Sequence, residues 1–308
     1  MKELLTGKTV ERRDFLKFSL AAGAAAALAP SILAEKAEAP KPEVWVIHGK
    51  DKEKMMEKCL EIIKSQGGFG KNVKTLALKV NAAWAREPEV GANTDPVLVS
   101  SFLAGVKKMG INDIFIPENS CASPKESFPR SGIKEAVEAN GFEMIDLKTK
   151  GDHYRKVTIP GGESLKEADV AKYFLDADAV VNMPVAKHHG GSKLSMAMKN
   201  WMGAVRDRGY WHRNSLHQCI ADFAGFMKPT WTIIDATKTM MDKGPQGPSK
   251  KMKYPDLLIF SKNQVAADAW ASTLFHRLPE EVLYIKLAAQ KGLSPLSVED
   301  MIVHKIEV

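Results

Sequence analysis

Apolar runs of two kinds alternate along the chain from residue 40 onward. Continuous runs such as VWVIHG at 44–49 and the segment at 176–187 are typical of strands buried on both faces of a sheet. Between them, Met55, Met56 and Cys59 begin a series of apolar residues at helical spacing, with lysines and glutamates at the intervening positions. The pattern therefore predicts strands and helices in alternation.

The same reasoning places the other elements. It predicts strands at 73–81, 111–120, 142–147, 156–160, 230–237 and 256–262, and helices at 52–66, 96–110, 131–141, 195–205, 215–226, 265–278 and 283–290. This alternation is typical of an α/β fold, in which a mostly parallel β-sheet carries helices on both faces. We expect a single α/β domain over 40–308 and leave open a subdomain at about 145–230.

Residues 1–39 have a different composition from the rest of the chain. A polar start leads to paired arginines at 12–13, a Phe-Leu pair and an alanine-rich apolar run from 18 to 33. This order resembles a twin-arginine signal peptide. It predicts the twin-arginine export machinery as a partner and a periplasmic or other extracytoplasmic location. The resemblance also implies export in the folded state, often after a cofactor is inserted, and the cleavage position stays open.

Charge and cysteine content exclude several classes of protein. The net charge is +7, but no run of five lysines or arginines occurs, so we expect no nucleic acid partner. No apolar run of about 20 residues remains after residue 40, so we expect no stable membrane span after processing. The three cysteines share no CxxC spacing, so we expect no iron–sulfur cluster held by this chain's own cysteines; other cofactors stay unknown.

Polar residues follow several of the predicted strands. They stand just past the apolar runs, at Lys79 and Asn81, at Glu118, Asn119 and Ser120, at Lys187, and at Asp235. Ligands of open α/β sheets bind at the carboxyl ends of the strands. We therefore interpret Lys79, Asn81, Asn119 and Asp235 as ligand-binding residues, although each also suits a helix cap or a turn.

The segment at 182–217 holds the densest chemistry in the chain. Its candidate catalytic residues are Lys187, His188, His189, Lys199 and His217, and its candidate ligand-binding residues are Lys193 and Asn200. A helix starting at Ser195 is expected to turn its N-terminal amides toward an anion. The competing interpretation is a basic surface helix whose methionines only pack against the core. The basic residues favour an anionic small molecule as the ligand.

A protein-held metal is not predicted by any motif. The chain contains no HExxH, and the adjacent His188 and His189 point in opposite directions if they lie on a strand. A mixed site of His188, His217 and Asp235 is conceivable from the residue types alone. Metal binding therefore stays undecided at this point.

Several motifs together resemble the family called domain of unknown function 362. They are LALKVN at 76–81, TDP at 94–96, PVAKHHGGSKLSMAMKNWMGAV at 184–205, and the later His217, Asp235 and Asp268. Val80 stands where the family usually has proline. The resemblance implies that Lys187, one of the two histidines, Lys199, Asn200 and Gly203 belong to the family's central motif. Many relatives carry a ferredoxin-like part that this chain lacks, and no established reaction comes with the resemblance.

Two functions from different classes fit these observations. The first is an exported enzyme that acts on an anionic small molecule or cofactor: lysines supply charge, histidines supply acid–base function, and Asp235 pairs with a histidine or lysine. The second is a non-catalytic accessory protein that binds a ligand, a metal or a redox partner protein, with the Met–Trp helix as its docking face.

Overall fold

The computed structural model describes residues 40–149 and 151–308, so the signal peptide expected at 1–39 lies outside the described residues. The strands are β1 (Glu43–His48), β2 (Thr75–Val80), β3 (Asp113–Glu118), β4 (Met144–Asp146), β5 (Tyr154–Thr158), β6 (Glu167–Ala171), β7 (Ala179–Met183), β8 (Val185–His189), β9 (Lys193–Ser195), β10 (Trp231–Met240), β11 (Met252–Lys253), β12 (Leu257–Ser261) and β13 (Ile302–Glu307). The α-helices are α2 (Lys52–Ser65), α3 (Pro96–Lys108), α4 (Pro124–Arg130), α5 (Ile133–Glu138), α6 (Lys172–Asp176), α7 (Ala197–Asn200), α8 (Arg208–Arg213), α9 (Leu216–Phe226), α10 (Gln264–Ser272) and α11 (Leu283–Gln290). The 3₁₀ turns are η1 (Pro88–Val90), η2 (Trp201–Gly203), η3 (Thr273–Phe275), η4 (Pro279–Glu281) and η5 (Val298–Asp300).

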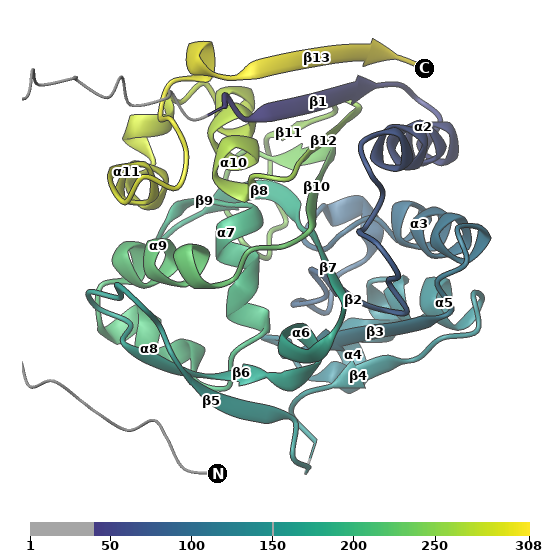
Figure 1. Ribbon diagram of the computed structural model, residues 1–308, viewed down its shortest axis with the longest axis horizontal. Helices are drawn as coiled ribbons and strands as arrows, with labels where there is room; N and C mark the ends of the chain where they lie inside the picture. The colour runs from purple at the N-terminus through teal and green to yellow at the C-terminus, as the bar shows by residue number, and fades with distance from the viewer. Residues whose placement is uncertain (1–39, 150) are drawn as a thin grey trace, which may run out of the picture. The chain divides into compact units, whose positions relative to one another are not determined.

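A mixed β-sheet forms the centre of the unit made by Lys41–Val308. Its strands run in the order β13-β1-β12-β10-β7-β2-β3-β4 (Figure 1). Neighbours from β10 through β4 pair in parallel, whereas β12 pairs antiparallel with both β1 and β10. The predicted α/β class with a mostly parallel sheet is confirmed. Within 145–230, β5 and β6 form a separate two-stranded sheet, while β7 and β8 belong to the main sheet.

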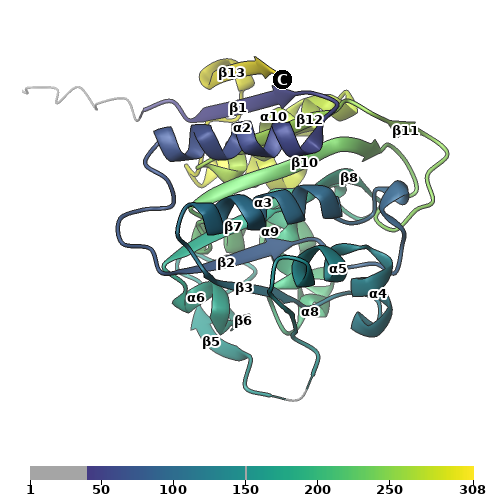
Figure 2. The same cartoon turned by 90° about the vertical axis from the view of Figure 1, so that its right-hand side faces the viewer.

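Helices cover both faces of the sheet. Figure 1 shows α2, α3 and α5 on one face and α7, α9, α10 and α11 on the other, and Figure 2 looks onto the face with α2 and α3. Side chains of β2 point alternately to the two faces of the sheet. Leu76, Leu78 and Val80 pack in the hydrophobic core beneath α2 and α3, whereas Ala77 packs in the core on the other face. Lys79 shares the parity of Ala77, so its side chain leaves the strand on the side of α7.

Two expected helix starts are confirmed by their caps. The carboxylate of Asp51 accepts a hydrogen bond from the Lys54 amide at 3.0 Å, and that of Asp95 accepts from the Val97 amide at 3.0 Å. Pro96 occupies the first turn of α3, where its missing N–H costs nothing. Among the described residues, no helix combines the length and the apolar composition needed to cross a membrane.

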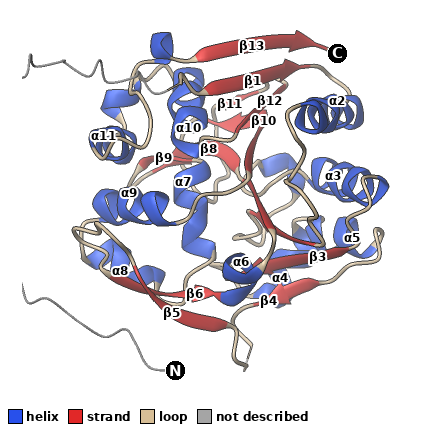
Figure 3. Cartoon of the chain, in the orientation of Figure 1, coloured by secondary structure: helices blue, strands red, loops and turns tan. Residues whose placement is uncertain are grey.

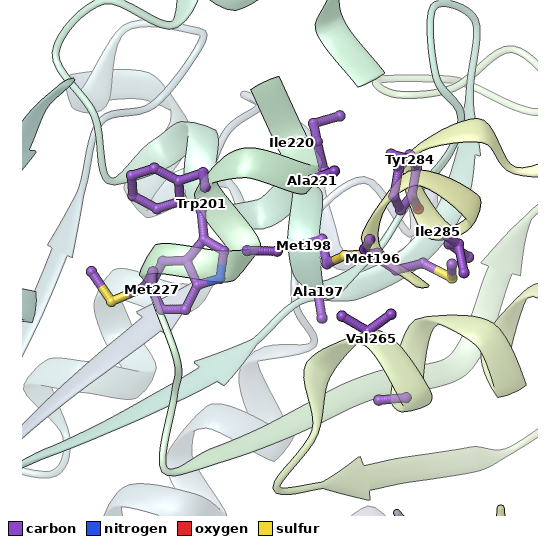
Figure 4. Close-up of a cluster of buried hydrophobic side chains, with 14 of the residues drawn as sticks. Met196, Ala197, Met198, Trp201, Ile220, Ala221, Met227, Val265, Tyr284 and Ile285 are labelled. Atoms are coloured by element: carbon purple, nitrogen blue, oxygen red, sulfur yellow. The ribbon is translucent and has the colours of Figure 1, made fainter. Parts of the chain in front are cut away.

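The segment around 185–205 differs from the sequence-based expectation. His188 and His189 lie on β8, which forms a hairpin with β9, and the predicted helix at 195–205 is reduced to α7 and η2 (Figure 3). Met196, Met198 and Trp201 are fully buried against α9 and α10 (Figure 4). The proposed docking face on this helix is therefore wrong, because its apolar side chains are core residues.

Asp222 on α9 anchors the loop between β5 and β6. Its Oδ2 accepts hydrogen bonds from the amides of Glu163, Ser164 and Leu165 at 2.8–2.9 Å, and its Oδ1 accepts from Gln218 and Lys291. These bonds hold the pKa of Asp222 below its ordinary value despite burial. We expect Asp222→Ala to lower the free energy of unfolding by about 3 kcal/mol, because one buried and two part-buried amides lose their acceptor.

Urea denaturation at neutral pH measures this loss. Asp222→Asn keeps one acceptor oxygen and is expected to fall between wild type and Asp222→Ala. Equal unfolding midpoints for wild type and Asp222→Ala would show that the loop contributes nothing to stability.

Candidate functional site

A cavity of about 260 Å³ lies where β2, β3, β8 and β9 end and where α7, η2 and α8 approach them. Its polar lining includes Asn81, Glu118, Lys187, His189, Lys199 and Arg208. This is the edge at which parallel sheets place their ligands.

A buried ion pair forms the wall of the cavity beneath η2. Nζ of Lys79 donates to Oε2 of Glu118 at 2.9 Å, and both side chains are 1% exposed. Oε2 also accepts from the Ala82 amide at 3.1 Å. Burial lowers the pKa of Lys79, while the carboxylate of Glu118 opposes that shift. Lys79 is therefore a paired, structural cation behind the cavity surface.

Because Gly203 has no side chain, the ion pair of Lys79 and Glu118 packs directly against its backbone. A Cβ added there would stand 2.1 Å from Oε1 of Glu118 and 2.8 Å from Nζ of Lys79. The backbone also contributes, because the carbonyl of Gly203 accepts a hydrogen bond from the Asn119 amide at 2.8 Å. A side chain at 203 would have to displace a buried pair that is already fully packed.

A chain of buried amides connects the sheet, α7 and the cavity. Nδ2 of Asn200 donates to Oδ1 of Asn182 at 2.8 Å, and Nδ2 of Asn81 donates to Oδ1 of Asn200 at 3.0 Å. Oδ1 of Asn81 in turn accepts from Nζ of Lys187 at 3.1 Å. Asn182 lies opposite Lys79 in the β7–β2 register. The amides therefore fix the position of the Lys187 amine relative to the strand ends.

Two cavity lysines are buried without a carboxylate partner among the described residues. Lys187 is 1% exposed, and its Nζ donates to Oδ1 of Asn81 and to the carbonyl of Ala92. Lys199 is 8% exposed, and within the described chain its Nζ has a hydrogen bond only to Sδ of Met202, at 3.3 Å. Burial lowers the pKa of Lys187 to about 7 and that of Lys199 to about 8. Lys187 therefore loses its proton more readily than Lys199 as the pH rises.

His189, rather than His188, lines the cavity. Nδ1 of His189 accepts from the amides of Gly191 and Ser192 at 3.0 and 3.2 Å. Burial, with repulsion from Lys199 and Lys187, lowers the pKa of His189 to about 2. The ring is therefore neutral with its proton on Nε2, a donor and not a base. His188 lies on the other face of the strand, where Nδ1 accepts from the Gly244 amide at 3.2 Å.

Three further side chains reach the cavity and were not assigned to it from sequence. Arg208 and His212 lie on α8, a helix that the apolar pattern did not predict, and Cys121 follows β3. Arg208 donates to Sγ of Cys121 at 3.0 Å and to the carbonyl of Ser120 at 2.6 Å. Burial lowers the pKa of His212. The cluster of basic residues at 206–213 was the available signal, but no apolar periodicity placed it.

Besides Lys79 and His188, four more of the residues predicted from sequence lie outside the cavity lining. Asn119 holds the chain before α8, through hydrogen bonds to the Val205 carbonyl and from Arg208. Lys193 is exposed and donates to the carbonyl of Glu281 at 2.8 Å. His217 is stacked on Tyr284 with ring centroids 6.2 Å apart.

The fourth, Asp235, lies within β10 and has a structural role there. It accepts from the Asp95 amide at 2.9 Å and from the hydroxyl and amide of Thr237 at 2.7 and 3.0 Å. The expected pairing of Asp235 with a histidine or lysine is therefore wrong. Burial raises the pKa of its carboxyl group.

The N-terminal amides of α7 do not face an anion from solution. Asp268 on α10 accepts from the amides of Ala197 and Met198 at 2.7 and 3.0 Å. The expected use of these amides for ligand binding is wrong, because a buried carboxylate of the chain already occupies them. Among residues 40–149 and 151–308, no group of three or more His, Cys, Asp or Glu side chains is arranged to hold a metal ion.

These features define an α/β protein with a buried, cationic cavity at the carboxyl edge of its sheet. Residues 76–273 match the family described as domain of unknown function (DUF362), and the chain belongs to that family. Residues 9–29 match the signal sequence of the twin-arginine translocation pathway, which indicates export across the membrane by that machinery. Both resemblances inferred from the sequence are thereby confirmed.

Two known proteins illustrate the range of similarity. A thylakoid-associated protein of Synechocystis sp. is 22% identical over 249 residues, which cover 78% of this chain and 75% of that protein. The lactate racemase apoprotein of Thermoanaerobacterium thermosaccharolyticum is 12% identical with a TM-score of 0.42. That alignment covers 68% of this chain and 54% of the racemase, so the chain spans about half the length of that structure.

Gly203→Ala tests the packing of the buried ion pair. The added methyl group collides with Glu118 and Lys79, so we expect the free energy of unfolding to fall by about 1–3 kcal/mol. Gly190→Ala is the matched control, because nothing lies within 4 Å of a Cβ added at Gly190. Thermal unfolding of both variants measures the difference, and equal losses of melting temperature would contradict the close approach at Gly203.

Proposed function

We propose that the cavity binds an anionic small molecule and that the protein is an enzyme in which Lys187 moves a proton of that molecule. It acts in the periplasm or another extracytoplasmic compartment after export. The observation that carries the proposal is the environment of Lys199: a buried ammonium that faces a cavity and has only a thioether as its hydrogen-bond partner in the described chain.

Charge balance supports an anion as the ligand. Glu118 is the carboxylate of the lining, and it already pairs with Lys79. Lys199 and Arg208 therefore leave the cavity with an excess of positive charge. Burying an ammonium without a counter-charge costs several kcal/mol, and an anion at this point offsets that cost. Nε2 of the neutral His189 adds a hydrogen-bond donor that does not depend on pH near neutrality.

The environment of Lys187 suits proton transfer. With a pKa of about 7, a large share of its amine is neutral and carries a free electron pair at physiological pH. When the amine takes a proton, a substrate C–H bond breaks, an N–H bond forms, and the electron pair stays on the substrate. Oδ1 of Asn81 and the carbonyl of Ala92 then accept hydrogen bonds from the new ammonium, while Lys199 stabilises the anionic product.

Anion affinity is expected to depend on pH and on Lys199. Both lysines are protonated below their pKa values of about 7 and about 8 and lose their charge above them. Acetate keeps its charge throughout, so its affinity is expected to fall at least about tenfold from about pH 6 to about pH 9. Lys199→Gln is expected to weaken acetate binding at least about tenfold at the lower pH. Isothermal titration calorimetry with acetate and with inorganic phosphate measures both effects.

Two further variants control this experiment. Lys58→Gln removes an exposed charge on α2, which covers the face of the sheet opposite to α7 (Figure 1). This variant is expected to bind acetate as the wild type does. Lys199→Arg keeps the charge and is expected to retain part of the affinity. Acetate binding that is unchanged in a folded Lys199→Gln protein would overturn the anion site.

Proton transfer by Lys187 predicts exchange with solvent. We expect small carboxylates incubated with the exported protein in D₂O to gain deuterium at an acidic C–H, as measured by mass spectrometry. Lys187→Gln is expected to abolish the exchange while the melting temperature stays within about 5 °C of wild type, because glutamine still bonds Asn81. Equal exchange rates in both proteins would remove Lys187 from the chemistry, and binding without exchange for every acid would favour a non-catalytic binding protein.

A further inference from the structure

A second basic hollow adjoins the cavity at the end of β3. It has a volume of about 440 Å³ and is lined by Lys148, Arg206, Arg208, Tyr154 and Asn119 together with uncharged neighbours. No carboxylate belongs to its lining among the described residues. We call it the outer cleft, and the cavity with Lys187 and Lys199 the inner cavity.

Arg208 forms the boundary between the two hollows. It lines both of them, and Nη2 donates to Oδ1 of Asn119 at 2.9 Å and to the Ser120 carbonyl at 2.6 Å, while Nη1 donates to Sγ of Cys121 at 3.0 Å. The guanidinium is therefore fixed in place by the strand end. Because the same side chain lines both, the outer cleft and the inner cavity lie next to each other.

Lys148 is held at the rim of the outer cleft by neutral groups. Nζ of Lys148 donates to the carbonyls of Cys121 and Ala122 at 3.3 and 3.0 Å. Burial, together with repulsion from Arg208, lowers the pKa of Lys148, while the carboxylates of Asp146 and Glu118 oppose that shift. Such repulsion between neighbouring cations is relieved by an anion placed between them.

Arg206 is positioned by an aromatic ring and a distant carboxylate. Its guanidinium lies over the ring of Tyr154, 4.8 Å from the centroid, and Nε is 3.7 Å from Oδ2 of Asp169. This salt bridge is half exposed and long, so it neutralises Arg206 weakly. The outer cleft therefore keeps a positive charge that its own lining does not balance.

We propose that the ligand is an elongated dianion, with one anionic end at Lys199 in the inner cavity and the other at Lys148 and Arg206 in the outer cleft. The two ends are carboxylates or phosphates joined by an uncharged chain that passes Arg208. This inference rests on the proposed anion site and extends it to a substrate class. Joining the two ends in one molecule makes the second contact intramolecular, which raises affinity without any new kind of interaction.

The affinities of a homologous series of diacids test whether one ligand bridges the inner cavity and the outer cleft. The full mature protein is titrated by calorimetry with acetate and with linear α,ω-dicarboxylates from malonate to suberate, at constant ionic strength. We expect affinity to rise at least about tenfold above that of acetate at one chain length and to stop rising beyond it. Lys148→Gln and Arg206→Gln are expected to lower the ratio of diacid to acetate affinity at least about fivefold, whereas Lys199→Gln weakens both ligands.

The results separate the two proposals. Measurable acetate binding with the same affinity for every diacid overturns the elongated dianion and leaves the inner anion site standing. Acetate and diacids that all fail to bind overturn the proposed function itself. Lys156→Gln is the matched control, because Lys156 is an exposed lysine of β5 paired with Glu167 and is expected to keep the wild-type ratio. Lys148→Gln and Arg206→Gln are tested as separate variants, and circular dichroism confirms that each is folded.

Discussion

The cost of burying charged amines governs the functional edge of this protein. Three lysines, Lys79, Lys187 and Lys199, are at least nine-tenths buried there, and the cavity lining supplies one carboxylate. The desolvation cost is offset or avoided in a different way at each lysine. Lys79 pairs with Glu118, Lys187 loses its proton readily, and Lys199 keeps its charge without a counter-charge from the described chain. The proposed anion would supply the counter-charge that the third arrangement lacks.

Such a site needs supports that do not move, because a displaced amine would recover its hydration. The amides of Asn182, Asn200 and Asn81 provide them, since each bond uses a donor of one amide and an acceptor of the next. The chain of amides begins inside the sheet and ends at Lys187. The same reasoning explains the short α7: Asp268 fixes its first turn, and Gly203 ends the following turn against the Lys79–Glu118 pair.

The sequence predicted the fold class and much of the site, but it could not assign partners. Alternating apolar runs located the sheet and its main helices. The strand-end rule identified Asn81 and Lys187, and the concentration of polar residues at 182–217 identified Lys199 and Asn200. Asp235 was also selected by the strand-end rule, but it lies inside β10 rather than at its end, and its carboxylate accepts a hydrogen bond from the Asp95 amide. Asn182 was not predicted as a site residue because it lies within an apolar strand. Helix α8 was not predicted because its six residues show no apolar periodicity. Both depend on contacts between segments far apart in the chain.

The separation of roles between His189 and Lys187 follows from backbone geometry. A histidine in a cationic cavity is the usual first choice for a base, yet two amides from the tight turn after β8 bond to Nδ1 and leave no site for a second proton. The lysine two residues earlier faces the same cavity, since side chains alternate along a strand. Within residues 40–149 and 151–308, the amine of Lys187 has two hydrogen-bond acceptors and no carboxylate partner, so its proton is easily lost and easily regained. The proposed proton transfer near neutral pH therefore depends on the amine, with the imidazole as a fixed donor beside it.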